Sequence, residues 1–403
     1  MKNKKPEIRF KGFSEDWEER SLKGITSDIS DGDWIETNHI FSEGEYRIIQ
    51  TGNLGLGEYL DKSNNAKFFH QKDFDEIKAN EIFPNDILIS RLAEPAGRTI
   101  ILPETGYRMV TAVDVTIIRP DEDSFNSIFL MTQLNSENVL QVINENVSGT
   151  SHRRISRRNL EKTKLAVPIL SEQTQIGNFF KNLDSLITLH QQKYEKLGIL
   201  KKAMLEKMFP KNGKNVPEIR FKGFSGAWEE KELSCIVSRV SCISNKVGLP
   251  RVEYEDIVSG KGELNKNIEQ KNSRKIGIEF EIGDVLYGKL RPYLNNWLLP
   301  TFQGIAVGDF WVFRPNETNS KFIFYLIQTS DYEKIANQSS GSKMPRADWN
   351  LMSNAVFFIP LNKNEQEKIG NYFKNLDKLL TLHQGELGKL KNLKKAMLEK
   401  MFV

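Results

Sequence analysis

The sequence is poor in features that mark several common classes of protein. It contains only two cysteines, Cys235 and Cys242, both in the second half of the chain, so neither a disulfide framework nor a cysteine-rich metal site is expected. No stretch approaches the roughly 18 apolar residues of a membrane span, and the opening MKNKKPEIRF lacks the apolar core of a signal peptide. These absences indicate a cytoplasmic protein with two reduced thiols and no membrane partner.

The sequence also has little net charge and no metal-ligand spacing. A formal charge of +4 on 403 residues is too small to indicate nucleic-acid binding by itself. The sequence shows no metal-ligand spacing among its five histidines, which are His39, His70, His152, His190 and His383. We therefore expect no metal site and no cofactor.

Catalytic signatures are missing as well. The glycines of TGNLGLGE at 51–58 run in the reverse order of a dinucleotide fingerprint, and no phosphate-binding G-x-x-x-x-G-K-[ST] occurs. No proline follows an asparagine, which removes the Asn-Pro-Pro-aromatic motif of adenine methyltransferases, and Pro120-Asp121 has no nearby Glu-x-Lys of the common nucleases. The chain is therefore not expected to be an enzyme.

An internal repeat dominates what is present. PEIRFKGFSEDWEE at 6–19 returns as PEIRFKGFSGAWEE at 217–230, and EQTQIGNFFKNLDSLITLH from Glu172 returns as EQEKIGNYFKNLDKLLTLH from Glu365. KKAMLEKMFP at 201–210 returns as KKAMLEKMFV at 394–403. The chain is thus two tandem copies of one unit of about 200 residues.

The end of each copy has the pattern of a long helix. Alternating steps of four and three residues persist over about five heptads, which is typical of a coiled coil. A helix of roughly 38 residues would be on the order of 57 Å long. We predict a helix seam, in which the two histidines set the register, from Ile176, Phe180, Leu183, Ile187, His190, Ile369, Phe373, Leu376, Leu380 and His383.

The middle of each copy reads as an α+β globule. Short β-type runs such as DILIS, VTIIRP, DVLYGKL and FWVFRP alternate with Gly, Pro and Asn. The middle segments of the two copies have diverged, and only a few short motifs still match, at a separation that decreases along the chain. The helices, in contrast, have stayed nearly identical. This contrast is typical of linked binding modules that read different targets on one framework.

Cationic loops recur at matching places in the two copies. SGTSHRR from Ser148 and SGSKMPR from Ser340 combine hydroxyls with Arg or Lys, and the first opens a run at 151–164 with four Arg and two Lys against one Glu. Hydroxyls and amides can bind phosphate while Arg reads guanine, and loops after strands often carry function. The candidate DNA-binding residues are Arg91, Arg98, Thr150, Ser151, His152, Arg153, Arg154, Lys289, Arg291, Tyr293, Ser342, Lys343 and Arg346. A solvated basic face that binds nothing is the alternative.

These motifs together resemble the DNA-specificity subunit of type I restriction and modification systems. The resemblance covers essentially the whole chain and rests on the repeated opening, the G-[ST]-x-x-x-R element at 149–154 and 341–346, and the repeated KKAMLEKMF. It places the contact loops at 151–154 and 343–346, where the second copy has KMPR and lacks one of the paired arginines.

The resemblance implies a domain organisation and a set of partners. Target-recognition domains are expected at 1–170 and 231–364, separated by conserved spacer helices that form a pseudo-twofold antiparallel coiled coil; these helices fall at 171–209 and 365–403, with a linker and the repeated signature at 210–230. Each domain would read one half of a split double-stranded DNA target. The helices would set the gap and dock two methyltransferase subunits, which two restriction (motor and nuclease) subunits then join. S-adenosylmethionine, ATP and Mg are expected on those partners.

Two other interpretations remain open at this point. An enzyme that both reads and modifies DNA is disfavoured by the missing motifs, and methyl transfer by the purified chain alone would revive it. A coiled-coil scaffold without a nucleic-acid role predicts binding that is insensitive to salt. A DNA reader with about six phosphate contacts should instead lose around a thousandfold in affinity between about 50 and 200 mM salt.

Overall fold

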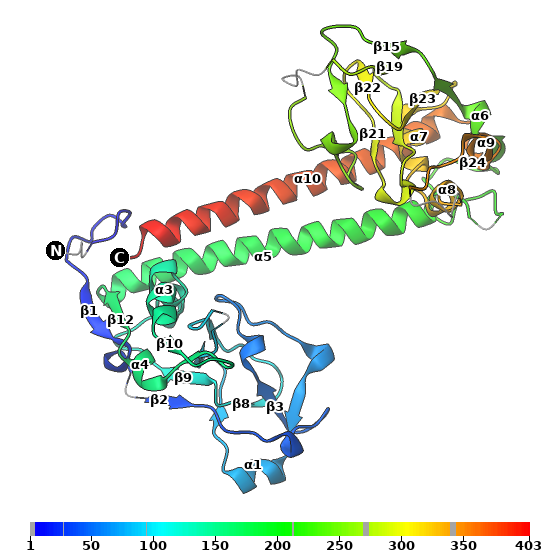
Figure 1. Ribbon diagram of the computed structural model, residues 1–403. Helices are drawn as coiled ribbons and strands as arrows, with labels where there is room; N and C mark the ends of the chain where they lie inside the picture. The colour runs from blue at the N-terminus through cyan, green and yellow to red at the C-terminus, as the bar shows by residue number, and fades with distance from the viewer. Residues whose placement is uncertain (1–4, 27, 94, 212, 269–273, 339–343) are drawn as a thin grey trace. The chain divides into compact units, whose positions relative to one another are not determined.

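The computed structural model describes residues 5–26, 28–93, 95–211, 213–268, 274–338 and 344–403. The chain forms two compact units, which we call unit 1 (1–189 with 387–403) and unit 2 (190–386) (Figure 1). Each unit therefore combines a globule with parts of two long helices. None of the helices in the described ranges is both long enough and apolar enough to cross a membrane.

The two long helices are α5 (Leu170–Lys207) and α10 (Lys363–Lys400), each 38 residues long. Within each unit the contributing stretches run antiparallel. The pairing of Lys394 with Asp184, at 2.5 Å, is found in unit 1, and that of Lys201 with Asp377, at 2.7 Å, in unit 2. The expectation of an α+β fold with two long conserved helices is confirmed.

The residues predicted for the helix seam lie on the less exposed side of the long helices. Ile176, Phe180 and Leu183 of α5 are buried, and the positions that follow at four- and three-residue steps are at least half-buried. At His190 and His383 the two Nδ1 atoms lie 3.1 Å apart within unit 2. Burial and the neighbouring side chains of His190 and Lys193 lower the pKa of His383, which favours a neutral His383 imidazole in the helix seam.

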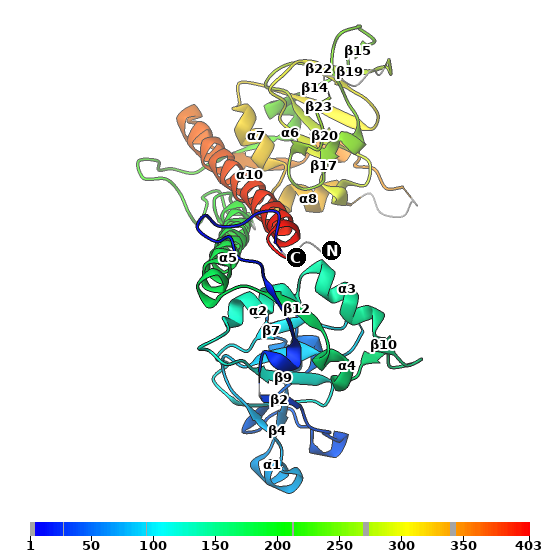
Figure 2. The ribbon, with the colours of Figure 1, turned by 90° about the vertical axis from the view of Figure 1, so that its left-hand side faces the viewer.

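Unit 1 contains two four-stranded sheets, in the orders β2-β9-β6-β7 and β4-β3-β8-β5, and two-stranded pairs β1-β12 and β10-β11. Only the β3–β8 contact is parallel among these pairings. Both views place α3 on the side of the globule next to the long helices and α1 at the opposite end (Figures 1 and 2). The elements are β1 (Glu18–Ser21), β2 (Asp28–Asp31), β3 (Tyr46–Ile49), β4 (Lys67–Phe69), α1 (Gln71–Ile77), β5 (Glu81–Ile82), β6 (Ile87–Ser90), β7 (Thr99–Ile101), β8 (Arg108–Thr111), β9 (Val115–Arg119), α2 (Ser127–Leu134), α3 (Glu137–Glu145), β10 (Val147–Ser148), β11 (Arg154–Ile155), α4 (Arg157–Glu161) and β12 (Lys164–Val167).

Unit 2 repeats this plan. Its sheets have the orders β14-β23-β20-β21 and β15-β19-β22-β16, with two-stranded pairs β13-β24 and β17-β18. The parallel contact is now β16–β22. The elements are β13 (Glu229–Glu232), α6 (Leu233–Ile236), β14 (Val237–Val240), β15 (Ile243–Ser244), β16 (Arg251–Val252), β17 (Ile257–Val258), β18 (Glu263–Leu264), β19 (Gly277–Phe280), β20 (Val285–Gly288), β21 (Trp297–Leu298), β22 (Gly304–Ala306), β23 (Phe310–Pro315), α7 (Ser320–Leu326), α8 (Ser330–Ala336), α9 (Trp349–Ser353) and β24 (Val356–Ile359).

The central strands are buried on both faces, which explains their apolar sequences. In β6, Ile87 and Ile89 join the core beneath the long helices, whereas Leu88 faces the core shared with the second sheet. In β20, Val285 and Tyr287 face the helix side and Leu286 the other. Because successive side chains of a strand point to opposite faces, each globule has two cores, one on each face of its central strands.

The repeated ends of the two copies supply core residues. Met401 and Phe402 pack in unit 1, where the Phe402 ring lies 6.3 Å from that of Trp17 and 5.7 Å from that of Phe180. Met208 and Phe209 pack in unit 2 against Trp228 in the same way. The end of each copy therefore completes the core of the unit that holds the other copy's opening signature.

Candidate nucleic-acid interface

Folding brings two predicted contact loops of unit 1 side by side. Residues 91–93 and 95–98 follow β6, and the loop 149–153 joins β10 to β11. Ala93 N donates to Arg153 O at 3.0 Å, and Ile155 N donates to Arg91 O at 3.0 Å. Residues about 60 positions apart in the sequence thereby form one continuous surface.

Unit 2 builds the same surface with the same backbone bonds. Arg291 N donates to Pro345 O at 2.7 Å, and Ala347 N donates to Lys289 O at 2.9 Å. Isolated bridges between Leu92 and Arg154 in unit 1, and between Leu290 and Arg346 in unit 2, complete the match. The loop framework is therefore duplicated even though its side chains have diverged.

An aspartate holds the two loops together in each unit. Arg154 Nη1 donates to Asp114 Oδ1 at 2.7 Å, and Arg91 N donates to Asp114 O at 2.8 Å. In unit 2, Arg346 Nη2 donates to Asp309 Oδ2 at 3.0 Å, and Lys289 N donates to Asp309 O at 2.9 Å.

The charge balance at Asp309 favours its ionised form. Hydrogen bonding to Arg346, together with the charges of Arg346 and Lys289, lowers the pKa of Asp309. Tyr254 adds a further link in unit 2, since its Oη accepts from Leu290 N at 2.8 Å and donates to Asp309 O at 2.8 Å. Burial raises the pKa of Tyr254, so the phenol remains a donor.

Asp114 and Asp309 were not among the residues predicted from the sequence. A signal for them exists, because each precedes the Arg of an Arg-Pro landmark by five positions, in DVTIIRP and DFWVFRP. Nothing local ties these aspartates to arginines about 40 positions downstream, so the sequence alone does not single them out.

The predicted residues of unit 1 fall into two groups. Thr150, Ser151, His152, Arg153 and Arg154 are all exposed on the 149–154 segment. Arg91, by contrast, is only 8% exposed, bonds to Val113 O, and lies 3.5 Å from Asp31 Oδ2.

Arg98 is half-buried and donates to Thr51 O at 3.3 Å. Both arginines thus have partners on neighbouring segments of unit 1.

In unit 2 the predicted residues lie on the equivalent loops. Tyr293 and Arg346 are exposed, and Lys289 and Arg291 are half-buried. Ser342 and Lys343 lie outside the described residues. Among the described residues of this site, Tyr293, Met344 and Arg346 are exposed and Arg291 is half-buried.

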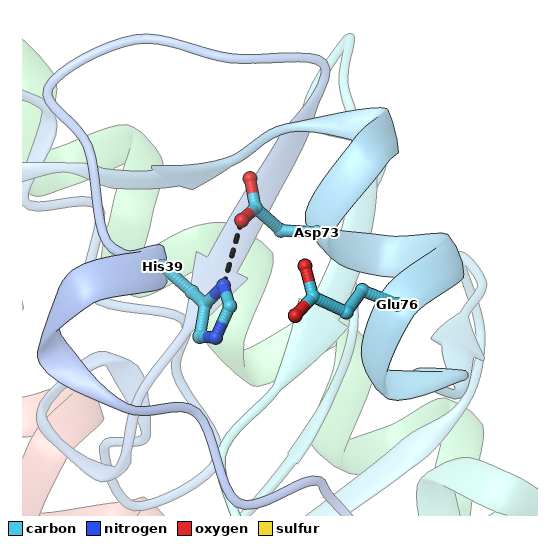
Figure 3. Close-up of side chains that lie close together, drawn as sticks. All are labelled: His39, Asp73 and Glu76. Carbon is cyan, nitrogen blue, oxygen red and sulfur yellow. Dashed lines mark hydrogen bonds and ion pairs between the residues drawn. The ribbon is translucent and has the colours of Figure 1, made fainter.

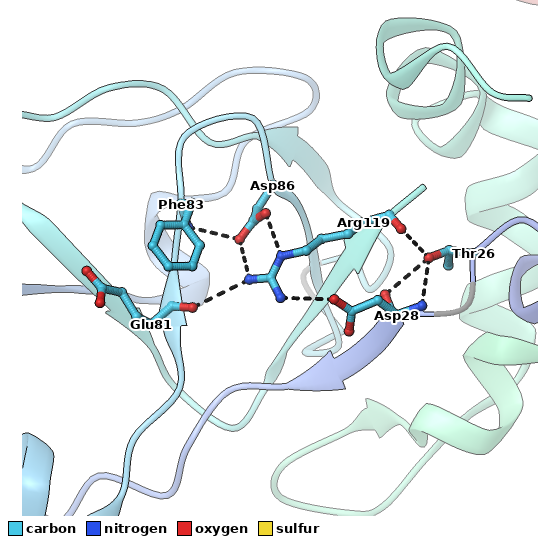
Figure 4. Close-up of polar contacts among 6 residues, drawn as sticks. All are labelled: Thr26, Asp28, Glu81, Phe83, Asp86 and Arg119. Carbon is cyan, nitrogen blue, oxygen red and sulfur yellow. Dashed lines mark hydrogen bonds and ion pairs between the residues drawn. The ribbon is translucent and has the colours of Figure 1, made fainter. Parts of the chain in front are cut away.

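The arginines of the two Arg-Pro pairs, at 119–120 and 314–315, form structural ion pairs. Arg119 donates to both carboxylate oxygens of Asp86, each at 2.8 Å, and to Asp28 Oδ2 at 3.0 Å (Figure 4). Arg314 binds Asp284 in the same bidentate manner in unit 2. Arg119 is the last residue of β9 and Arg314 the second last of β23, and each binds the aspartate directly before the neighbouring strand, β6 or β20. These ion pairs therefore tie neighbouring strands together.

One cluster of possible metal ligands appears that no sequence spacing indicated. One ligand atom each from His39, Asp73 and Glu76 lies within 4.8 Å of the others (Figure 3). His39 Nδ1 is 2.6 Å from Asp73 Oδ1, and the His39 ring meets Phe69 edge-on. This pair already links the 3-10 turn Thr37–His39 to α1, which accounts for the geometry as an internal polar contact.

The chain is thus a tandem α+β protein in which each unit carries the same loop framework. The family described as "Type I restriction modification DNA specificity domain" matches residues 14–198 and 239–392. Because these ranges cover most of the chain, the protein belongs to this family of non-catalytic DNA-recognition subunits.

Individual relatives agree with this assignment. The chain is 22% identical over 386 residues to the type I restriction enzyme MjaVIII specificity subunit of Methanocaldococcus jannaschii, covering 88% of this chain and 85% of that one. It is 22% identical over 298 residues to the EcoDI specificity subunit of Escherichia coli, covering 65% and 67%. The crystal structure of the type I restriction-modification S subunit from M. genitalium shares the fold, with a TM-score of 0.59, 16% identity and 99% coverage of both chains.

Proposed function

We propose that this chain reads a bipartite double-stranded DNA target, with one half-site contacted by the loop surface of each unit. The observation that carries the proposal is the duplicated framework around Asp114 and Asp309. The same backbone hydrogen bonds hold both surfaces, while the side chains displayed on them differ. Equal frameworks with unequal side chains are what two readers of different short sequences require.

The loop chemistry supports contact with both phosphates and bases. In unit 1 the segment 150–154 offers two hydroxyls, an imidazole and two guanidinium groups at the surface. Hydroxyls and backbone amides suit phosphate oxygens, whereas a guanidinium can donate two bonds to the edge of a guanine. The chain itself needs no cofactor for this role.

The long helices are proposed to dock two methyltransferase subunits, which two restriction subunits then join in the cytoplasm. Three exposed leucines recur at equivalent positions of the two copies, where they project outside the helix seam. Each unit carries one set of three; they are Leu186, Leu189 and Leu393 in unit 1, and Leu379, Leu382 and Leu200 in unit 2. Matching apolar faces suit two identical partners, and S-adenosylmethionine, ATP and Mg belong to those partners.

The deciding experiment is a methylation map at single-base resolution. DNA would come from a host without other methyltransferases that expresses this chain with a type I methyltransferase subunit. We expect a split motif with a fixed unread gap that disappears when the chain is omitted. A complex that forms but methylates nothing would contradict the proposal and favour the scaffold interpretation.

A further inference from the structure

The two loop surfaces differ at one pair of neighbouring positions. Ala93 and Arg153 are joined by a backbone hydrogen bond in unit 1, and the corresponding bond in unit 2 joins Arg291 to Pro345. The register is fixed on either side, because Ser90 N donates to Arg98 O just as Gly288 N donates to Asn296 O. Each pair therefore holds one arginine, but it comes from the hairpin loop in unit 1 and from the post-strand loop in unit 2.

One other arginine of the surface has the same role in both units. Arg154 and Arg346 occupy the same position, and each is paired with the aspartate that holds the loops together. A residue that is held identically in both units cannot account for a difference between the sequences they read. We assign Arg154 and Arg346 as positioning residues.

Arg153 has the features of a residue available to a ligand. It is exposed, and within the described ranges its side chain forms no hydrogen bond or ion pair. Its backbone is nevertheless fixed by the bond from Ala93. The backbone of Arg153 is thus held in place while its guanidinium N–H groups are available to donate hydrogen bonds to a ligand.

Arg291 has features that stability does not explain. Its φ of 48° lies in the left-handed region, which is unfavourable for a residue with a Cβ. Its Nε is buried and, among the described residues, has no hydrogen-bond partner. Backbone strain together with an unsatisfied buried donor is found at sites retained for function.

We propose that Arg153 in unit 1 and Arg291 in unit 2 each read a guanine edge in the major groove of their half-site. Each guanidinium would contact a guanine, but Arg153 comes from the hairpin loop of unit 1 and Arg291 from the loop after the strand in unit 2. This inference rests on the proposed function, since it names the residues that distinguish the two readers. A bidentate contact to O6 and N7 is the chemistry that an arginine at such a place supports.

The test uses the full chain in complex with methyltransferase subunits and a library of randomised duplexes. The wild-type complex should select a split motif. Arg153→Ala should reduce discrimination at a guanine of one half-site by about tenfold to a hundredfold, and Arg291→Ala should do so in the other half only. Arg154→Ala should weaken binding to its half-site without abolishing the base preference, as expected of a positioning residue.

Two further variants make the test specific. Ala93→Arg combined with Arg153→Ala moves the arginine to the side used by unit 2, and we expect it to restore guanine preference in the same half-site. Arg158→Ala, on the exposed face of α4, is the matched control and should preserve the motif. Unchanged preferences in Arg153→Ala and Arg291→Ala, with a wild-type motif present, would overturn this inference. Absence of any wild-type motif would instead overturn the proposed function.

Discussion

A buried glutamate ties the opening signature of each copy to a long helix. Arg9 donates to both oxygens of Glu172 at 2.6 and 2.7 Å, and Arg220 does the same for Glu365 at 2.6 and 2.8 Å. The glutamates are almost fully buried. A carboxylate in that position is stable only while it is paired, which explains why the signature retains its arginine in both copies.

Arg9→Ala should therefore destabilise unit 1. We expect a loss of about 3 kcal/mol or more in the free energy of unfolding, because the variant leaves an uncompensated charge at Glu172. Urea unfolding followed by tryptophan fluorescence measures this loss. Lys11→Ala, an exposed cation two residues along, is the control; equal stability of the two variants would mean that the Arg9 pair contributes little.

Single residues were the hardest feature to foresee from the sequence. Arg9 and Glu172 are 163 positions apart, and Asp114 meets Arg154 across 40 positions. Such pairs depend on how the strands are ordered in the sheets, which periodicity does not specify. The place of Arg91 and Arg98 after a strand predicts DNA contact, but it does not reveal their partners inside unit 1, which are Val113 O for Arg91 and Thr51 O for Arg98.

At the scale of elements the sequence was far more informative. A heptad repeat is local, so the positions of the helix seam followed from counting steps of three and four. The strands DILIS and FWVFRP were equally evident, because burial on both faces requires continuous apolar runs. Those runs could not reveal which strands pair in parallel.

Two leucines of α5 test the helix seam directly. Leu183 is 5% exposed and Leu186 is 43% exposed. Leu183→Ala should lower the free energy of unfolding by about 2 to 5 kcal/mol through lost packing and a cavity, whereas Leu186→Ala should change it by roughly 0.5 kcal/mol or less. Denaturant midpoints of both variants provide the comparison, and similar losses would show that the seam is misplaced.

The lowered pKa of His383 predicts that the helix seam is sensitive to acid. The pKa of His383 lies below its ordinary value of 6.5 in the folded chain, so the unfolded state binds more protons as the pH falls through 6.5. Stability should consequently decrease on acidification through that range, and the loss is complete once the pH is below the lowered folded pKa.

Thermal unfolding at pH 7.5 and pH 5.5 measures the effect, using buffers of equal ionic strength. The double variant His190→Asn with His383→Asn keeps polar groups in the helix seam but removes the titration. We expect a smaller acid shift of the midpoint in this variant than in the wild type. An identical shift would assign the acid sensitivity to other groups.

For the whole molecule, the repeat and the compact units do not have the same boundaries. Met401 and Phe402 end the second copy but pack against Trp17 of the first, and Phe209 of the first copy packs against Trp228 of the second. Duplication was plain from the sequence, whereas this exchange of ends was not, because identical ends fit either core equally well. The near-identity of the ends is thus explained partly by packing, beside any role in docking.

The exposed leucines carry the last prediction, which concerns assembly. Leu189 and Leu382 are equivalent, 43% and 54% exposed, and belong to different units. If each apolar face docks one methyltransferase subunit, a buried glutamate should prevent docking at the altered face alone, because an unpaired charge is costly to desolvate. Leu189→Glu or Leu382→Glu should then lower the number of bound subunits from two to one, and the double variant should bind none.

Native mass spectrometry of the co-expressed complex counts the bound methyltransferase subunits. Gln192→Glu is the control, because it adds the same charge to an exposed position of α5. Two subunits retained by the double variant would place the docking surface elsewhere.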